Sequence, residues 1–161
     1  MEIGGAESSL LGLLQSIDYS LVSVDILLLS PVGELMYLIP PMVHILDTPK
    51  AYHSLVAPIK EAVKSGSIGI ACARLFGKAV VSQKKNYNDK VYLTKQYCHR
   101  YSLPFLPKIK KKYDLAISFI DPHYITGNKV DARVKLSWLH TDFSRIDVVD
   151  KLDFKIGRAH V

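Results

Sequence analysis

The stretch that decides the fold is Val134–Ile146, VKLSWLHTDFSRI. Its first half alternates apolar and polar residues, as a half-buried β-strand does. Its second half is polar and places His140 two residues before Asp142. Ligands of open parallel sheets bind beyond the carboxyl ends of the strands. We therefore predict a strand over 133–139 that delivers both side chains to a site at the edge of the sheet.

The rest of the chain alternates between helical and strand patterns. Leucines and an isoleucine at positions 10, 13, 14 and 17 have the spacing of an amphipathic helix. We predict further helices over 52–65, 68–81 and 90–101, strands over 22–30, 43–47 and 113–120, and a short helix or turn over 122–132. Gly66-Ser67 separates the first two of these helices, and Pro58 offers a later start for the first. Strands separated by helices predict an α/β fold: a Rossmann-like, mainly parallel sheet with flanking helices.

Length and composition indicate one ordinary globular domain. The chain has 161 residues, of which 48% are hydrophobic and 22% charged. Cys72 and Cys98 lack the spacing of a zinc site or a disulfide framework, so a reducing compartment is expected. The start of the chain does not have the pattern of a signal peptide. The most apolar stretch, 22–46, is interrupted by charged residues and prolines, which is unlike a membrane span.

Positive charge is concentrated in the middle of the chain. Residues 60–112 hold 13 lysines and arginines against two acidic residues, a net charge of +11 in a chain of net +6. Such a segment suits lipid headgroups, phosphate-bearing substrates or nucleic acid. A solvated, lysine-rich face is the alternative.

A second candidate feature is Gly4-Gly5, which precedes the first predicted helix. Backbone N–H groups at a helix start can hold an anion. The topology brings this loop and His140 to the same edge of the sheet. Each feature also has a structural interpretation: a tight turn for the glycines, a hydrogen-bonding role for His140, and a capping role for Asp142. The patterns GxxxxGK[ST], GxGxxG and GxSxG do not occur, which disfavours an ATPase, a dinucleotide dehydrogenase and an α/β-hydrolase.

Taken together, four stretches resemble the bacterial family 4 glycosyltransferases, the two-domain GT-B enzymes that build surface polysaccharides such as capsules. The stretches are EIGGAESSLLGLLQSIDYSLVSVDILLLSPVGEL (2–35), YDLAISFID (113–121), VKLSWLHTDFSRI (134–146) and DKLDFKI (150–156). The resemblance covers nearly all of residues 1–155, most loosely in the basic middle. It implies a GGAE loop after a first strand, and a strand of the form K-x-x-W-x-H-x-D that leads into the cleft between the two domains.

The resemblance also implies roles for individual residues. Gly4 and Gly5 would lie beside the donor diphosphate, and Glu7 belongs to the same loop motif. On the catalytic side, His140 would face the transferred sugar or the acceptor, with Asp142 nearby. Ser8 stands where an arginine commonly follows GGAE, so a basic contact is not expected there. The implied reaction transfers a sugar from a nucleotide-sugar, with retention at the anomeric carbon and without a metal or other cofactor.

The same resemblance predicts partners and a location. The acceptor would be a saccharide, often lipid-linked, and the enzyme would be cytoplasmic, at the inner face of the plasma membrane. Four lysines would suit docking to anionic lipid there: Lys108, Lys110, Lys111 and Lys112. The rival prediction is a basic α/β module that binds nucleic acid or a phosphorylated ligand. It explains the charge, but not why Gly4-Gly5 and His140 share an edge.

Both ends of the sequence carry a prediction about its extent. A Rossmann-type unit has a strand before its glycine loop, so we expect residues 1–155 to be an acceptor-side domain without its first strand. The domain that binds the donor would lie outside this sequence. The last six residues, IGRAHV (156–161), match the translation of a sequencing adapter, and we expect them to be read-through.

Overall fold

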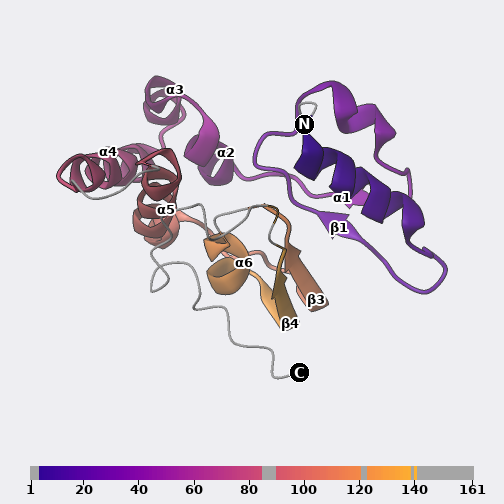
Figure 1. Cartoon of the computed structure of the whole chain (residues 1–161). Helices are drawn as coiled ribbons and strands as arrows, with labels where there is room; N and C mark the ends of the chain where they lie inside the picture. Colours follow the sequence, from indigo (N-terminus) through magenta and orange to yellow (C-terminus); the bar gives the residue numbers. More distant parts are fainter. Residues whose placement is uncertain (1–3, 85–89, 121–122, 139, 141–161) are drawn as a thin grey trace.

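The computed structural model describes residues 4–84, 90–120, 123–138 and 140. It is a mixed α/β structure with short parallel strands (Figure 1). The elements in chain order are α1 (Gly5–Ser16), β1 (Asp25–Ile26), η1 (Glu34–Leu38), β2 (His44–Ile45), α2 (Lys50–Val56), α3 (Ile59–Lys64), α4 (Ile68–Ser82), α5 (Lys90–Ser102), η2 (Leu103–Phe105), β3 (Lys112–Ser118), α6 (Tyr124–Lys129) and β4 (Asp131–Ser137).

The predicted helices are confirmed, with one change. The expected helix over 52–65 is two helices, because Pro58 follows an extended Ala57 and begins α3 as its N-cap. A residue before proline is disfavoured in the helical region, so the chain straightens there. The predicted break at Gly66 is present, and its φ of 83° is a conformation that glycine adopts most readily.

The strands agree less well with the sequence pattern. β3 and β4 match the predicted strands and pair in parallel, with Leu115 opposite Val134 and Ile117 opposite Leu136. The prediction over 22–30 was wrong in length, since β1 contains only two residues and pairs in parallel with the equally short β2. The run is also not fully buried, since its residues are half-buried or exposed. The length of a strand depends on how much partner backbone lies beside it.

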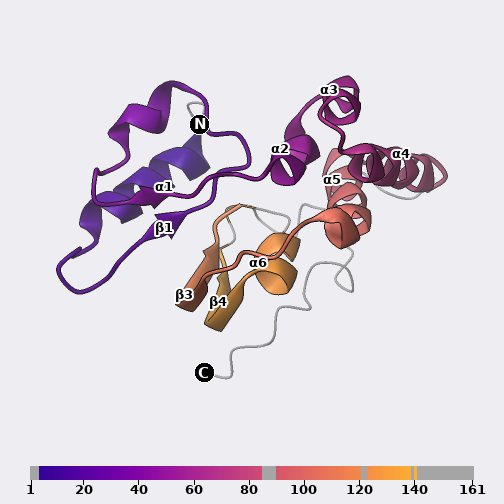
Figure 2. The ribbon, with the colours of Figure 1, turned by 180° about the vertical axis from the view of Figure 1, so that it is seen from behind.

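Within the described residues, the four strands form two pairs, with β1 beside β2 and β3 beside β4. The single sheet expected from the sequence is not formed. Figures 1 and 2 show the first pair with α1 toward one end of the molecule, and the α4–α5 hairpin at the other end. β3, β4 and α6 lie between and below them in these views.

The main hydrophobic core lies where the helices meet the chain that leads into β3. It is formed by Tyr52, Leu55, Ile70, Leu103, Leu106 and Tyr124. The Tyr52 hydroxyl donates a hydrogen bond to the Pro107 carbonyl at 2.5 Å. This bond joins α2 to a segment more than 50 residues later in the chain, so the core fixes where β3 begins.

Candidate functional site

The carboxyl ends of β3 and β4 carry a cluster of aromatic rings. Beyond the last strand pair, the Trp138 N–H donates to the Ser118 carbonyl at 2.8 Å, which continues the parallel ladder by one step. The rings of Phe119 and Trp138 lie 5.2 Å apart, and the His140 ring lies 4.5 Å from Phe119. Trp138 and His140 stack at 6.2 Å with an interplanar angle of 10°. The alternation along the strand places these two rings on one face.

His140 is exposed at the end of this cluster, so its imidazole is available to a ligand. Asp142, predicted beside it, lies outside the described residues. A second histidine, His123, is buried next to the carboxyl end of β3. His123, 2% exposed, has Nδ1 2.8 Å from the Ser118 Oγ, and thereby joins the start of α6 to β3.

At the start of α1, the Glu7 side chain fills the space beside the N-cap residue Gly4. Gly4 is the N-cap residue in an extended conformation, and its carbonyl accepts the first helical bond from Ser8. The Glu7 carboxylate folds back toward Gly4, where a side-chain Cβ at Gly4 would lie 2.5 Å from the Glu7 Oε2. At Gly5 an added Cβ would meet nothing within 4 Å. An anion bound at this helix start would therefore lie close to the Glu7 carboxylate near Gly4, and it could approach the backbone freely at Gly5.

The two predicted features lie on different elements, the start of α1 and the segment after β4. Among the described residues, no hydrogen bond or ring contact joins Gly4 or Gly5 to His140. Within the described residues, Gly4-Gly5 and His140 therefore do not form one constellation.

A hollow of about 500 Å³ opens at the carboxyl ends of β1 and β2. Its walls include Thr48, which follows β2, and Lys50 and His53 from α2. The Thr48 hydroxyl donates to the Leu28 carbonyl at 2.6 Å, and His53 Nδ1 lies 3.2 Å from the Leu29 carbonyl. The sequence pattern did not reveal this hollow, although Thr48 directly follows a predicted strand and Lys50 comes two residues later.

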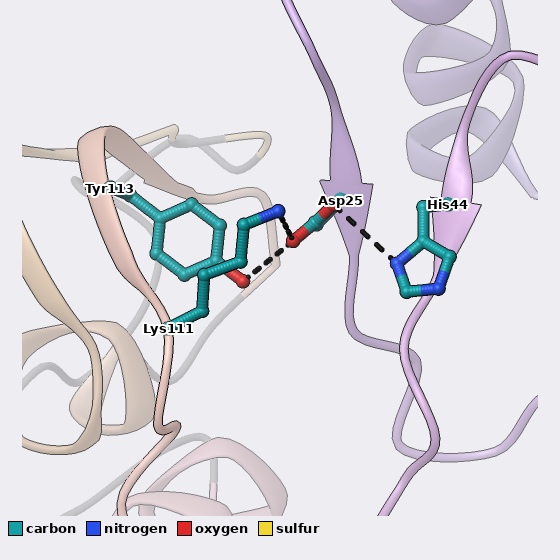
Figure 3. Close-up of polar contacts among 4 residues, drawn as sticks. All are labelled: Asp25, His44, Lys111 and Tyr113. Carbon is teal, nitrogen blue, oxygen red and sulfur yellow. Dashed lines mark hydrogen bonds and ion pairs between the residues drawn. The ribbon is translucent and has the colours of Figure 1, made fainter.

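Asp25 joins the two strand pairs (Figure 3). Its side chain is 3% exposed, and Oδ2 accepts hydrogen bonds from Lys111 Nζ at 2.7 Å and from the Tyr113 hydroxyl at 2.8 Å. On the other side, Oδ1 lies 3.5 Å from His44 Nδ1 on β2. The contact between β1 and β3 is thus made by the ends of side chains.

The neighbours of Asp25 determine its protonation. Burial by itself would raise the pKa of Asp25, but the hydrogen bonds from Lys111 and Tyr113 and the nearby charge of Lys111 hold it below its usual value. Burial together with the Asp25 carboxylate raises the pKa of Tyr113 to about 12. Asp25 is therefore ionised and Tyr113 protonated at neutral pH.

This cluster includes one lysine of the basic segment over 108–112. Lys111 was predicted to face lipid, but it is engaged with Asp25. Lys112 lies 3.8 Å from Asp131, with both side chains well exposed. The side chain of His44 is 71% exposed.

Within the described ranges, no three histidine, cysteine, aspartate or glutamate side chains gather as a metal site would require. None of the described helices is long and apolar enough to cross a membrane.

Comparison with known proteins gives no relative. No family model matches the chain, and neither a curated protein nor a solved structure matches it significantly.

Proposed function

We propose that this chain is the acceptor-side part of a retaining glycosyltransferase of the GT-B type, which transfers a sugar from a nucleotide-sugar to a saccharide, often lipid-linked, for surface polysaccharide. The observation that carries the proposal is the carboxyl end of the parallel pair β3–β4. There His140, Trp138 and Phe119 present rings and one polar group beyond the strands. This is where ligands bind in open α/β sheets.

The order of the strands supports the same fold. A Rossmann sheet has the order 3-2-1-4-5-6, so its first strand lies between the second and the fourth. Here β2 lies beside β1, β3 lies beside β4, and Asp25 bridges β1 to β3 through long side chains. Strands in a sheet lie about 4.8 Å apart, so a missing neighbour leaves a separation of about 10 Å. Lysine and tyrosine side chains are suited to such a span.

The proposed reaction breaks the bond between the anomeric carbon and the donor phosphate oxygen. The oxygen of an acceptor hydroxyl forms the new bond to that carbon on the same face. The hydroxyl proton passes to the departing nucleoside diphosphate. Negative charge develops on that diphosphate, and backbone N–H groups at a helix start stabilise such charge.

The residues of this chain have binding roles in that scheme. His140, whose ring lies against Phe119, would donate a hydrogen bond to a sugar hydroxyl. Gly5 leaves one side of the α1 start open to a diphosphate. Glu7 carries a like charge at that point, so its carboxylate would turn away when a diphosphate binds.

Trp138 allows a direct binding test, because it is the only tryptophan in the sequence. The chain is titrated with UDP-glucose, GDP-mannose and maltotriose while the Trp138 emission is recorded. We expect at least one of these probes to change the emission in a saturable manner. His140→Ala should weaken that response by about tenfold, the loss of one good hydrogen bond to a ligand.

A pair of glycine variants tests the diphosphate separately. Gly5→Glu and Gly12→Glu add the same charge to α1 at positions where an added Cβ meets nothing within 4 Å. Only Gly5→Glu should weaken the binding of a nucleotide-sugar. A chain whose emission ignores all three probes and responds instead to a single-stranded RNA, with a steep salt dependence, contradicts the proposal and favours a nucleic-acid-binding module.

A further inference from the structure

The outer side of α4 is apolar, although it is exposed. Ile68, Leu75 and Phe76 are 59%, 53% and 58% exposed, and Cys72 is exposed between them. Ala79, one turn further along, is exposed as well. From Ile68 to Ala79 the exposed positions follow one another at steps of four, three and four residues, the spacing of a seam between two packed helices.

The apolar surface continues beside α4. The Phe105 ring lies against Gly69, where an added Cβ would be 2.5 Å from the ring, and Phe105 is itself 52% exposed. We call this surface the α4 outer face; it is formed by Ile68, Cys72, Leu75, Phe76, Ala79 and Phe105. Figures 1 and 2 place α4 at the opposite end of the molecule from α1. A partner that covers this face therefore leaves the start of α1 open.

The charged side chains of α4 lie away from this face. The helix contains two of them, Arg74 and Lys78. The Arg74 guanidinium is turned toward α2, where Nη1 donates to the Ser54 and Ala57 carbonyls at 2.7 and 2.6 Å. Lys78 comes six residues after Cys72, which places it about 120° around the helix from that residue. On this face α4 therefore presents apolar side chains without a cation, which suits an apolar partner better than an anionic one.

The α4 outer face complements itself when two copies of α4 run antiparallel. About a two-fold axis at Cys72, each residue meets the one that lies equally far beyond Cys72 in the second copy. Ile68 is then opposite Phe76 of the second copy, and Leu75 is opposite Gly69 and the ring that covers it. Each exposed apolar side chain thus has an apolar neighbour across the axis.

The antiparallel arrangement also separates the like charges. The two copies of Lys78 would lie about 18 Å apart along the helix axes. That distance exceeds the Debye length of about 8 Å at physiological salt. A parallel pairing would instead place the two lysines side by side, where they repel.

The size of the face fits a weak, reversible contact. Two phenylalanines and two aliphatic side chains, each more than half exposed, offer on the order of 400 Å² of apolar area per copy. Two such faces bury on the order of 800 Å² of apolar area, to which the margins of the helices add polar area. Specific interfaces of this size are the small, transient ones. We expect a dissociation constant on the order of 10–100 μM.

We propose that two copies of this chain associate through the α4 outer face, with the two α4 helices antiparallel and Cys72 near the two-fold axis. The contact covers Ile68, Leu75 and Phe76 of each copy. None of these residues has a role in the proposed sugar transfer, so the dimer and the proposed function can fail separately.

Sedimentation equilibrium with matched variants tests the contact. The chain should pass from monomer to dimer as its concentration rises through the micromolar range. Leu75→Glu should raise the dissociation constant by about tenfold or more, because two leucines leave the contact and two like charges enter it. Leu21→Glu makes the same change at a residue that is 80% exposed outside this face, and should leave the constant unchanged. A chain that stays monomeric, or variants that behave alike, overturns the proposal.

The salt dependence distinguishes this contact from an electrostatic one. α5, which packs on α4, contains Lys90, Lys95 and Arg100 and no acidic residue. Added sodium chloride screens the repulsion between the two hairpins, so it should strengthen the dimer. Association that added salt weakens would be held by opposite charges, and would overturn the apolar contact proposed here.

Cross-linking tests the antiparallel order. Cys72 is exposed and Cys98 is buried, so a short bis-maleimide should join two chains through Cys72, and Cys72→Ser should abolish the product. In the Cys72→Ser background, Ile68→Cys and Phe76→Cys should cross-link when the two variants are mixed, and much less when either is alone. A parallel pair would give the reverse result. That result, or no cross-link at Cys72, overturns the proposal.

Discussion

The helices between Lys50 and Ser102 and the two strand pairs are held together in different ways. The helices bury Tyr52, Leu93 and Gln96 completely. The β3–β4 pair instead leaves Leu115 and Val134, which are partners in the register, 46% and 42% exposed. The helical region is therefore stabilised mainly by buried side chains, including those it shares with Leu106 and Tyr124. The strands contribute backbone pairing and one side-chain bridge at Asp25.

The largest expected effect in this comparison is the loss of a core side chain in α5. Leu93→Ala should lower the free energy of unfolding by about 2–5 kcal/mol, because it removes a fully buried side chain and leaves a cavity. Val91→Ala in the same helix changes a side chain that is 71% exposed, and it should alter the free energy of unfolding by less than about 0.5 kcal/mol. Urea unfolding followed by circular dichroism measures both. Similar losses from the two variants would mean that α5 is not packed as described.

The next effect comes from the close approach of α4 and α5. An added Cβ at Gly77 would lie 2.9 Å from the Cys98 backbone nitrogen. Gly77→Ala should therefore destabilise the chain by about 1–3 kcal/mol, despite the better helix propensity of alanine. Gly12→Ala in α1 meets nothing within 4 Å and should stabilise it by about 0.5–1 kcal/mol. The comparison fails if both substitutions shift the unfolding midpoint in the same direction.

A smaller, pH-dependent effect is expected at Asp25. Its pKa is lowered in the folded chain, so its contribution to stability is complete above the usual value of 3.8 and is lost as the pH falls through the folded pKa. Asp25→Asn should cost about 1 kcal/mol at pH 7, because a charge-assisted bridge is lost. The cost should shrink as the pH is lowered below 3.8. Unfolding curves at pH 7 and pH 3 provide the measurement.

Asp131→Asn is the matched control for Asp25→Asn. Asp131 is well exposed, its partner Lys112 is 3.8 Å away, and surface pairs of this kind contribute about 0–1 kcal/mol. A loss of unfolding free energy in Asp131→Asn as large as that in Asp25→Asn would show that burial does not distinguish the two carboxylates.

The smallest effect is expected on the exposed face of the strand pair. Replacing Leu115 and Val134 together by threonine should change the free energy of unfolding by less than about 0.5 kcal/mol per site, because both side chains already contact water. Threonine also retains a good strand propensity. A loss comparable to that of Leu93→Ala would mean that this face is covered in solution, and would end the contrast between the two regions.

Much of the helical region could be predicted from the sequence. The spacing of the leucines in α1, and the breaks at Pro58 and Gly66, are local properties of the chain. β3 and β4 could be predicted as well, because each has seven residues with an alternating pattern. The apolar run before Pro31 did not reveal that β1 is short, since strand length depends on a distant partner.

The candidate site divides in the same way. The position of His140 at a strand end follows from sequence, and its stacking on Trp138 could have been anticipated because residues two apart share a face. The group around Asp25 could not, because Lys111 lies 86 residues further along the chain and reaches Asp25 only through tertiary structure. The hollow beside Lys50 and His53 also requires the folded shape.

The Asp25 bridge has a consequence for the order in which the chain folds. Lys111 is 86 residues from Asp25, whereas α4 and α5 are neighbours along the chain and pack directly on one another. Closing a long loop costs chain entropy before any contact repays it, while a helical hairpin assembles from local contacts. The hairpin should thus form early and serve as the platform on which β3 is positioned. The meeting of β1 with β3 should be the last step, after the helical hairpin and the β3–β4 pair are already in place.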